Sequence, residues 1–152
     1  MSALWWKYLH VAGAFGFLAS HGVAVAVAMR LRRERDPARC RAILDLSKST
    51  RPWMYVSLLV LIAAGVVRGF QLHAWSQGWI WAALGLLIAM LLAAFPLAVP
   101  YYIRVRRAVA EGADTSPDEL AGLLGSPRPL VILWVETAGL LAILWLMVFK
   151  PF

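Results

Sequence analysis

One stretch near the start of the chain decides the fold class: LHVAGAFGFLASHG, residues 9–22. It is apolar enough to cross a membrane as a helix, yet it carries two histidines, His10 and His21. At 3.6 residues per turn, the separation between them is about three turns, so both rings project from one face, roughly 16 Å apart along the axis. Ionisable groups inside a span are costly and usually face the interior of a bundle. What these histidines bind is therefore the functional question.

The composition of the whole chain is typical of a membrane protein. Of its 152 residues, 62% are hydrophobic and 15% are charged, whereas soluble domains are roughly 45–50% apolar and about 25% charged. The excess apolar surface has to face lipid. The net charge of +7 does not indicate nucleic-acid binding, because the basic residues lie in connections between apolar runs. The single cysteine, Cys40, cannot form an internal disulfide.

Four apolar segments, at about 5–29, 52–72, 79–101 and 129–149, approach the roughly 20 residues that a membrane-spanning helix needs. Helices are expected because each span has to satisfy its own backbone hydrogen bonds. The connection between the second and third spans is short, so these two are antiparallel neighbours. The sequence thus predicts an all-α membrane protein with one integral domain over residues 1–152, a four-transmembrane-helix bundle of up-down-up-down topology.

The basic residues predict the orientation of this bundle. Eight of the 15 lie in the first connection and four in the third, while Lys7, Arg68 and Lys150 lie on the other side. The positive-inside rule places both long connections in the cytoplasm and both termini on the outer side. We expect the protein in the cytoplasmic (inner) membrane of a bacterium.

The two long connections contain helix signals of their own. Asp36 is placed to cap a short helix with Pro37 at its first position, and Ile43, Leu44 and Leu46 are expected to lie on the membrane surface. Residues 116–119 have the spacing of a capping box, and Gly125 is placed to end the short helix that follows.

Small residues recur along the first span, Gly13 and Gly16 among them, which favours close approach of another helix. Pro96 and Pro100 are expected to kink the third span near its cytoplasmic end.

Polar residues inside the spans fall into two layers. In the inner layer, His21 and Glu136 each lie four residues to the cytoplasmic side of the midpoint of their spans, or about 6 Å at 1.5 Å per residue. An ionised glutamate at the centre of a span costs roughly 2.5–3.5 kcal/mol, which a histidine partner would offset. We expect a contact between them. It is either an interhelical clamp, worth about 1–2 kcal/mol, or a functional pair that relays protons or orients a ligand histidine.

The outer layer holds His10 and Arg68, with His73 near the outer interface. Histidines from two antiparallel helices can bind haem iron between them, and an arginine can bind a haem propionate. His10 and His73 are therefore candidate axial ligands of haem b, and Arg68 is a candidate propionate contact. The alternative is structural: His73 is an interfacial loop residue, and His10 is packed near the headgroups. One haem cannot be bound axially by both His10 and His21, three turns apart, so a second site or a clamp is expected at His21.

The chain resembles small four-helix bacterial membrane proteins of the CopD and HemJ type, and especially an uncharacterised membrane family related to them. The resemblance rests on four stretches: Lys7-Tyr8-Leu9-His10-Val11 with Gly13 and Gly16, Ala64-Gly65-Val66, Gly78-Trp79, and Tyr102-Ile103-Arg104-Val105-Arg106-Arg107 with Glu111-Gly112. It implies a four-helix bundle with a histidine in the first span. In HemJ-like members this histidine is associated with b-type haem and porphyrinogen oxidation, and here His10 matches it. HemJ-like members also use a lysine in a later span, and the three later spans here contain none.

Three functions stay open at this point. The first is a haem-b protein of membrane redox chemistry, which exchanges electrons with a redox partner. The second is a non-catalytic bundle that acts as an accessory or assembly protein in contact with lipid, another subunit or a second copy of itself. The third is a small transporter of protons or metal ions that uses His21 and Glu136. No sequence motif decides whether the protein is an enzyme.

Overall fold

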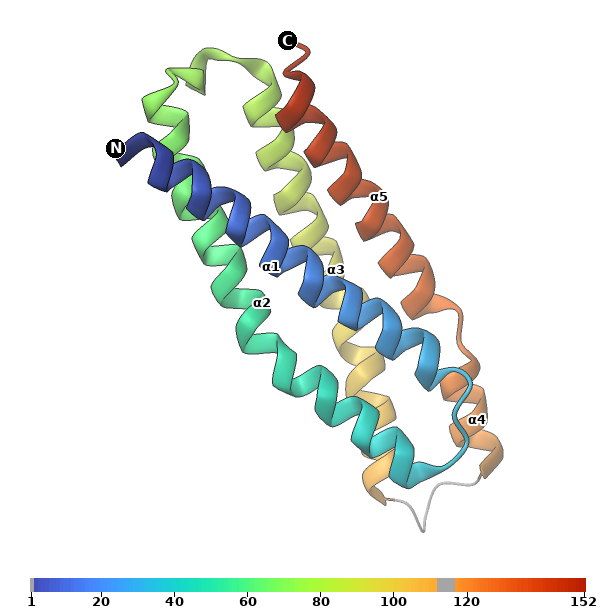
Figure 1. Ribbon diagram of the computed structural model, residues 1–152. Coiled ribbons are helices and arrows are strands. Elements are labelled where there is room, and N and C mark those ends of the chain that lie inside the picture. Colours follow the sequence, from blue (N-terminus) through green and yellow to red (C-terminus); the bar gives the residue numbers. More distant parts are fainter. Residues whose placement is uncertain (1, 112–116) are drawn as a thin grey trace.

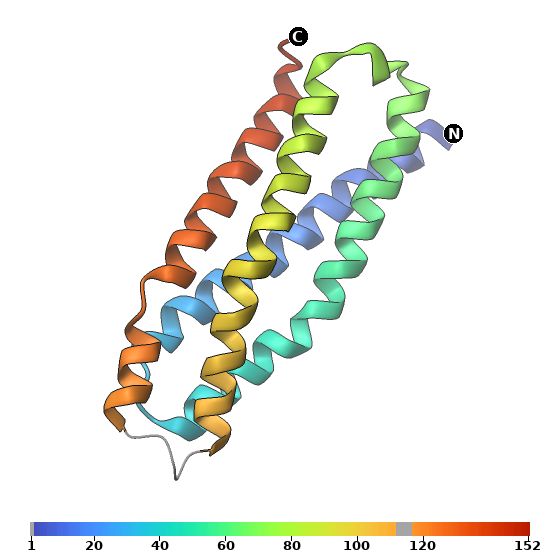
Figure 2. The ribbon, with the colours of Figure 1, turned by 180° about the vertical axis from the view of Figure 1, so that it is seen from behind.

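The computed structural model describes residues 2–111 and 117–152 and consists of helices joined by short connections (Figure 1). The helices are α1 (Ser2–Leu31), α2 (Pro37–Gln71), the 3-10 helix η1 (Ala74–Ser76), α3 (Gly78–Glu111), α4 (Pro117–Gly125) and α5 (Arg128–Phe149). Both termini and η1 lie at one end of the bundle, and α4 lies at the other (Figures 1 and 2). The chain is an all-α, four-span membrane bundle.

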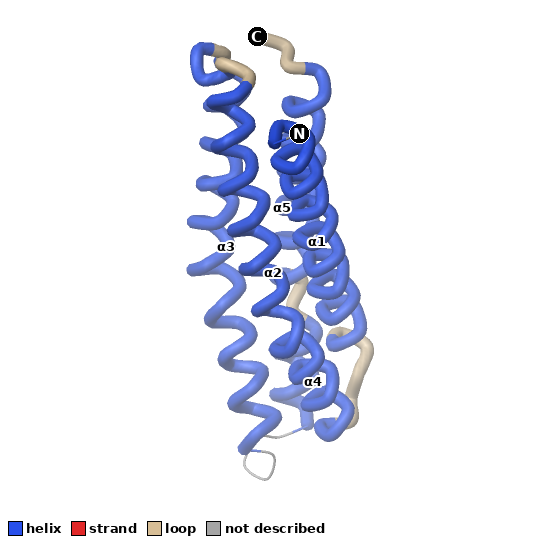
Figure 3. The backbone as a smooth tube through the Cα atoms, turned by 60° about the vertical axis from the view of Figure 1, so that its left-hand side comes forward, coloured by secondary structure: helices blue, strands red, loops and turns tan. Residues whose placement is uncertain are grey.

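The bundle consists of two antiparallel helix pairs, α1 with α2 and α3 with α5 (Figures 1 and 2). Figure 3 shows the short connections between the helices. In the first pair, Gly13 lies so close to α2 that a Cβ atom there would come within 2.7 Å of the Leu61 backbone nitrogen. One turn further along α1, Gly16 faces the side chain of Ser57. In the second pair, Gly139 of α5 faces the sulfur of Met90 of α3. Glycine therefore sets the close approach in both pairs, as in other membrane helix contacts.

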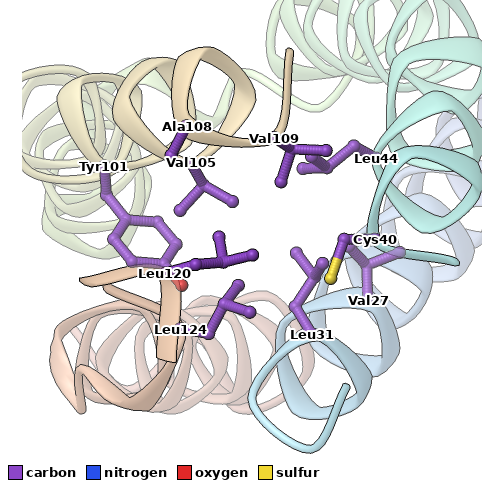
Figure 4. Packing of buried hydrophobic residues seen from close by; sticks show 10 residues of the cluster. All are labelled: Val27, Leu31, Cys40, Leu44, Tyr101, Val105, Ala108, Val109, Leu120 and Leu124. Atoms are coloured by element: carbon purple, nitrogen blue, oxygen red, sulfur yellow. The ribbon is translucent and has the colours of Figure 1, made fainter. Parts of the chain in front are cut away.

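Hydrophobic packing joins the two pairs at the α4 end of the bundle and joins η1 to α3 and α5 at the other end. At the α4 end, buried side chains from α1, α2, α3 and α4 meet in what we call the loop-end cluster (Figure 4). Its members are Val27, Leu31, Cys40, Leu44, Tyr101, Val105, Ala108, Val109, Leu120 and Leu124. At the opposite end, a smaller cluster contains Ala74, Trp79, Ile80, Ala83 and Leu146.

The long helices extend past the hydrocarbon layer. The 35 residues of α2 correspond to about 52 Å at 1.5 Å per residue, against roughly 30 Å for the hydrocarbon core of a bilayer. Four helical stretches are long and apolar enough to cross a membrane: Ala3–Leu31, Pro37–Gln71, Gly78–Ala110 and Leu120–Phe149. Many large apolar side chains of these stretches are exposed, including Phe15, Leu59, Leu92 and Leu141. These side chains face lipid.

The structure corrects the expectation of a separate short helix in the first connection. Asp36 does cap a helix, since its Oδ1 accepts a hydrogen bond of 2.9 Å from the Ala38 backbone nitrogen. That helix, however, continues through Pro52 to Gln71 as a single element. Proline removes only one backbone hydrogen bond, and nearby hydroxyls donate to backbone carbonyls in the turn before it: Ser49 to Leu46 at 2.8 Å and Thr50 to Ser47 at 3.1 Å.

Residues 43–46 are accordingly only partly at the surface. Leu44 is buried in the loop-end cluster and Ile43 packs against it, whereas Leu46 is exposed. The third span also runs further than expected, because α3 continues past Pro96 and Pro100 to Glu111. This extension brings Val105 and Val109 into the same cluster. The gain in apolar packing explains why both helices extend beyond the membrane.

The short helix predicted in the third connection is present as α4, which ends at Gly125. The capping box expected at residues 116–119 rests on Ser116, which lies outside the described residues.

Candidate functional site

His10 lies on the face of α1 that packs against α2. Its Nδ1 is 2.9 Å from the backbone carbonyl oxygen of Leu61. A carbonyl oxygen can only accept, so Nδ1 carries the proton and donates. In the neutral ring the other nitrogen, Nε2, then holds an unprotonated lone pair. Metal-binding histidines have this arrangement, in which one ring nitrogen donates to a backbone carbonyl and the other binds the metal.

The His10 ring has room on α2 because Gly65 has no side chain. A Cβ atom at Gly65 would lie 3.0 Å from His10 Cε1 and 3.1 Å from Nδ1. Leu61 and Gly65 are one turn apart on α2 and therefore lie on the same face of that helix. The Leu61 carbonyl binds the ring, and the missing side chain at Gly65 leaves space for it. The ring position is set jointly by these two residues.

Arg68 also joins α2 to α1, near the end of the bundle that carries the termini. Its Nη1 donates hydrogen bonds of 3.4 Å to the Ala3 carbonyl and to Gln71 Oε1. Both bonds are long for N–H donors, and a guanidinium has five N–H groups. Arg68 follows Gly65 by three residues and so lies about one turn from the His10 ring on the same helix face.

His73 lies in the connection after α2, immediately before η1. Its backbone has the left-handed conformation, with φ 51°, and its side chain is exposed. It comes eight residues after Gly65 and outside the helix that seats His10. Among the described residues, the structure shows no contact between His73 and His10.

The second candidate site joins the two helix pairs. His21 of α1 lies against Glu136 and Thr137 of α5. Its Nε2 is 3.0 Å from Thr137 Oγ1, and its Nδ1 is 3.8 Å from Glu136 Oε2. The side chains of His21 and Glu136 are 12% and 20% exposed. The structure therefore brings together the two residues that the sequence pairs by depth.

Thr137 fixes the direction of the hydrogen bonds in this second site. Its hydroxyl donates to the Leu133 backbone carbonyl at 2.7 Å, one turn earlier in α5. The single hydroxyl proton is thereby used, so Thr137 Oγ1 accepts from His21 Nε2. His21 thus carries its proton on Nε2, and Nδ1 faces the carboxyl group of Glu136.

The sequence indicates the depth of both sites but not the residues that hold the histidines. Leu61 acts through its backbone, which no sequence pattern identifies. Nothing in the sequence distinguishes Gly65 from the other small residues of the spans. Thr137 follows Glu136 directly, and its position at the depth of His21 was the available signal.

Among the described residues there is no group of three or more histidine, cysteine, aspartate or glutamate side chains that could hold a metal ion by themselves.

No curated protein and no solved structure matches the chain. A family model does match, over residues 4–151, with the description "Predicted integral membrane protein". The match covers nearly the whole chain and all four membrane-spanning stretches. The chain belongs to this family of integral membrane proteins, DUF2269.

Proposed function

We propose that the protein binds b-type haem in the bacterial cytoplasmic membrane, with His10 as an axial ligand, and takes part in membrane redox chemistry. The observation that carries the proposal is the seating of His10 on α2. The Nδ1 hydrogen bond to Leu61 fixes the tautomer of the neutral ring and leaves Nε2 to bind iron. The resemblance to CopD-like and HemJ-like proteins, in which His10 matches the histidine of the first span, supports the same assignment.

The other candidate residues fit haem unequally. Arg68 lies near His10 and has N–H groups beyond those that reach Ala3 and Gln71, so it is suited to a propionate. His73 is less suited, because it is exposed in the connection beyond α2. His21 is engaged with Thr137 and Glu136 at the second site. We therefore propose that His10 would hold the haem iron, with His73 as the second candidate ligand.

Haem would supply a centre that gains and loses one electron. This chain would hold the His10 ring in one orientation through Leu61 and would offer the Arg68 guanidinium to the haem carboxylates. Its electron-transfer partner would be another membrane redox protein or a second copy of the chain.

Absorption spectroscopy tests this proposal directly. The protein is purified in mild detergent, and its spectrum is recorded as isolated and after incubation with haem. We expect a Soret band in at least one sample. His10→Ala should abolish the band, whereas His21→Ala should retain it, because His21 lies at a different site. A wild-type protein that shows no Soret band in either sample would end this proposal.

A second function, a non-catalytic accessory or assembly protein, is favoured by one observation. His10 and His21 both join helices, His10 to α2 and His21 to α5. Under this alternative, His10→Ala leaves the activity of any partner complex intact, provided that the variant folds. Loss of partner function in a folded His10→Ala variant would contradict it.

A further inference from the structure

The pair formed by His21 and Glu136 is not used by the haem proposal, and it does not depend on that proposal. It connects α1 of one helix pair to α5 of the other at membrane depth. A clamp between helices needs no ionisable groups, since small or hydroxyl side chains serve that purpose. Two titratable side chains in contact raise the question of what they bind.

The protons of this cluster can be located from the hydrogen bonds. The Thr137 hydroxyl proton points to the Leu133 carbonyl, and the His21 Nε2 proton points to Thr137 Oγ1. In this arrangement both protons are engaged in hydrogen bonds. Only two positions are left for a further proton: His21 Nδ1 and the carboxyl group of Glu136.

These two positions face each other, with 3.8 Å between Nδ1 and Oε2. That distance is longer than a direct hydrogen bond, so transfer needs a small side-chain rotation or one bridging water. Moving a proton from the Glu136 carboxyl to His21 Nδ1 turns a neutral pair into an ion pair of the same net charge. Removing the proton leaves a carboxylate, and adding another leaves an imidazolium, each a net charge in a low-dielectric region.

The surroundings of the pair do not compensate such a net charge with a direct ion pair. Tyr102 of α3 lies within electrostatic range of Glu136 and of Arg51 of α2. From α1 and α5 themselves, the described neighbours in contact are Thr137 and, through it, the Leu133 carbonyl. No described arginine or lysine makes an ion pair with Glu136.

We propose that His21, Glu136 and Thr137 form an intramembrane proton-binding site that holds one exchangeable proton between Nδ1 and the carboxyl group at neutral pH. Thr137 fixes the orientation of the imidazole, and Glu136 is the second proton acceptor. The two groups titrate as a unit, because they interact at short range in a poorly solvated region.

The test is a pH titration of the full chain in lipid vesicles. Histidine ring nitrogens are followed by NMR with 15N-histidine, and carboxyl groups by infrared difference spectroscopy. We expect His21 and Glu136 to change protonation together. Glu136→Gln should shift the His21 midpoint by more than about one pH unit, since coupling of that size defines a joint titration. Asp45→Asn, which changes a carboxylate with a 74% exposed side chain, should leave the midpoint unchanged.

Thr137→Val tests the orienting role without altering either titratable group. It removes the acceptor for His21 Nε2, so the NMR spectrum of neutral His21 should change from one tautomer to a mixture. Independent titration of His21 and Glu136, or an unchanged His21 midpoint in folded Glu136→Gln, would overturn the proposal and leave the pair as a clamp. The haem spectrum plays no part in either readout, so this proposal can fail while the proposed function stands.

Discussion

At the level of single residues, the position of His10 depends on the absence of a side chain at Gly65. A methyl group there would contact Cε1 and Nδ1 of the ring at 3.0–3.1 Å, closer than ordinary van der Waals contact. The ring would have to move, and the hydrogen bond to the Leu61 carbonyl would lengthen. Gly65 therefore controls the orientation of Nε2 without touching it.

Gly65→Ala should weaken haem binding by about tenfold to a hundredfold, the usual loss when the partner that orients a ligand histidine is disturbed. The measurement is a haem titration of the purified variant. Gly85→Ala is the matched control, because nothing lies within 4 Å of a Cβ atom at Gly85. Equal haem affinity in Gly65→Ala and wild type would show that the position of the ring on α2 is irrelevant to haem.

The sequence predicts which helix face each histidine occupies and how deep it lies. It does not predict which residues of the neighbouring helix face each histidine, because that depends on the register between the packed helices. A shift of α2 by one residue would place a different carbonyl at His10. The pairing of His21 with Glu136 can be predicted because two ionisable residues at equal depth are rare inside a membrane, so depth alone selects the partner.

At the level of elements, the contact between α1 and α2 depends on Gly13. A Cβ atom there would lie 2.7 Å from the nitrogen and 2.9 Å from the Cα of Leu61. These are backbone atoms of another helix, which cannot move aside as a flexible side chain would. The two helices would have to separate locally.

Gly13→Ala should lower the free energy of unfolding by about 1–3 kcal/mol, the usual cost of overpacking. Unfolding in mixed detergent, followed by far-UV circular dichroism, measures this difference. Gly22→Ala is a control in the same helix, with open space around its Cβ position. A Gly13→Ala variant that is as stable as Gly22→Ala would contradict the close packing of α1 on α2.

Arg41 ties the loop-side part of α2 to the last turn of α3. Its Nε donates to the Val109 carbonyl at 3.0 Å, and its Nη2 donates to the carbonyls of Val109 at 2.6 Å and Ala110 at 3.2 Å. These carbonyls belong to the last turn of α3, where helix carbonyls generally need partners from outside the helix. A cation at this end also interacts favourably with the helix dipole.

Arg41→Ala should destabilise the end of α3 by about 1 kcal/mol, the typical value of a hydrogen-bonding group at a solvated site. Hydrogen–deuterium exchange should become faster in residues 105–111 and stay unchanged in α5. Arg39→Ala serves as the control, since Arg39 is 73% exposed and pairs only with Asp36 beside it. Identical exchange in the two variants would remove Arg41 from this role.

The boundaries of α2 and α3 at the α4 end of the bundle cannot be predicted from the sequence. Hydropathy predicts the four spans because lipid demands long apolar runs. It does not predict that α2 begins at Pro37 and α3 ends at Glu111, because these extensions are stabilised by packing outside the membrane. Leu44 and Val109 come from connections that look polar on average, yet both are buried in the loop-end cluster. Only the approach of four helices makes that burial possible.

At the level of the whole molecule, both termini and η1 lie at one end and α4 at the other. The concentration of arginine near the α4 end leads us to propose that this end faces the cytoplasm.

Cysteine labelling in a Cys40→Ser background tests this orientation. An impermeant maleimide should label Ser76→Cys in intact cells and Asp45→Cys only after the cells are opened. The reverse pattern would invert the topology.

We propose that His10 holds a haem in this bundle. The amount of haem bound per chain measures this directly. Wild-type and His10→Ala proteins, matched by circular dichroism, are incubated with haem, freed of excess and assayed as the pyridine haemochrome. We expect close to one haem per chain in the wild type and nearly complete loss in His10→Ala. Absence of haem from the wild type, or equal amounts in both proteins, would contradict it.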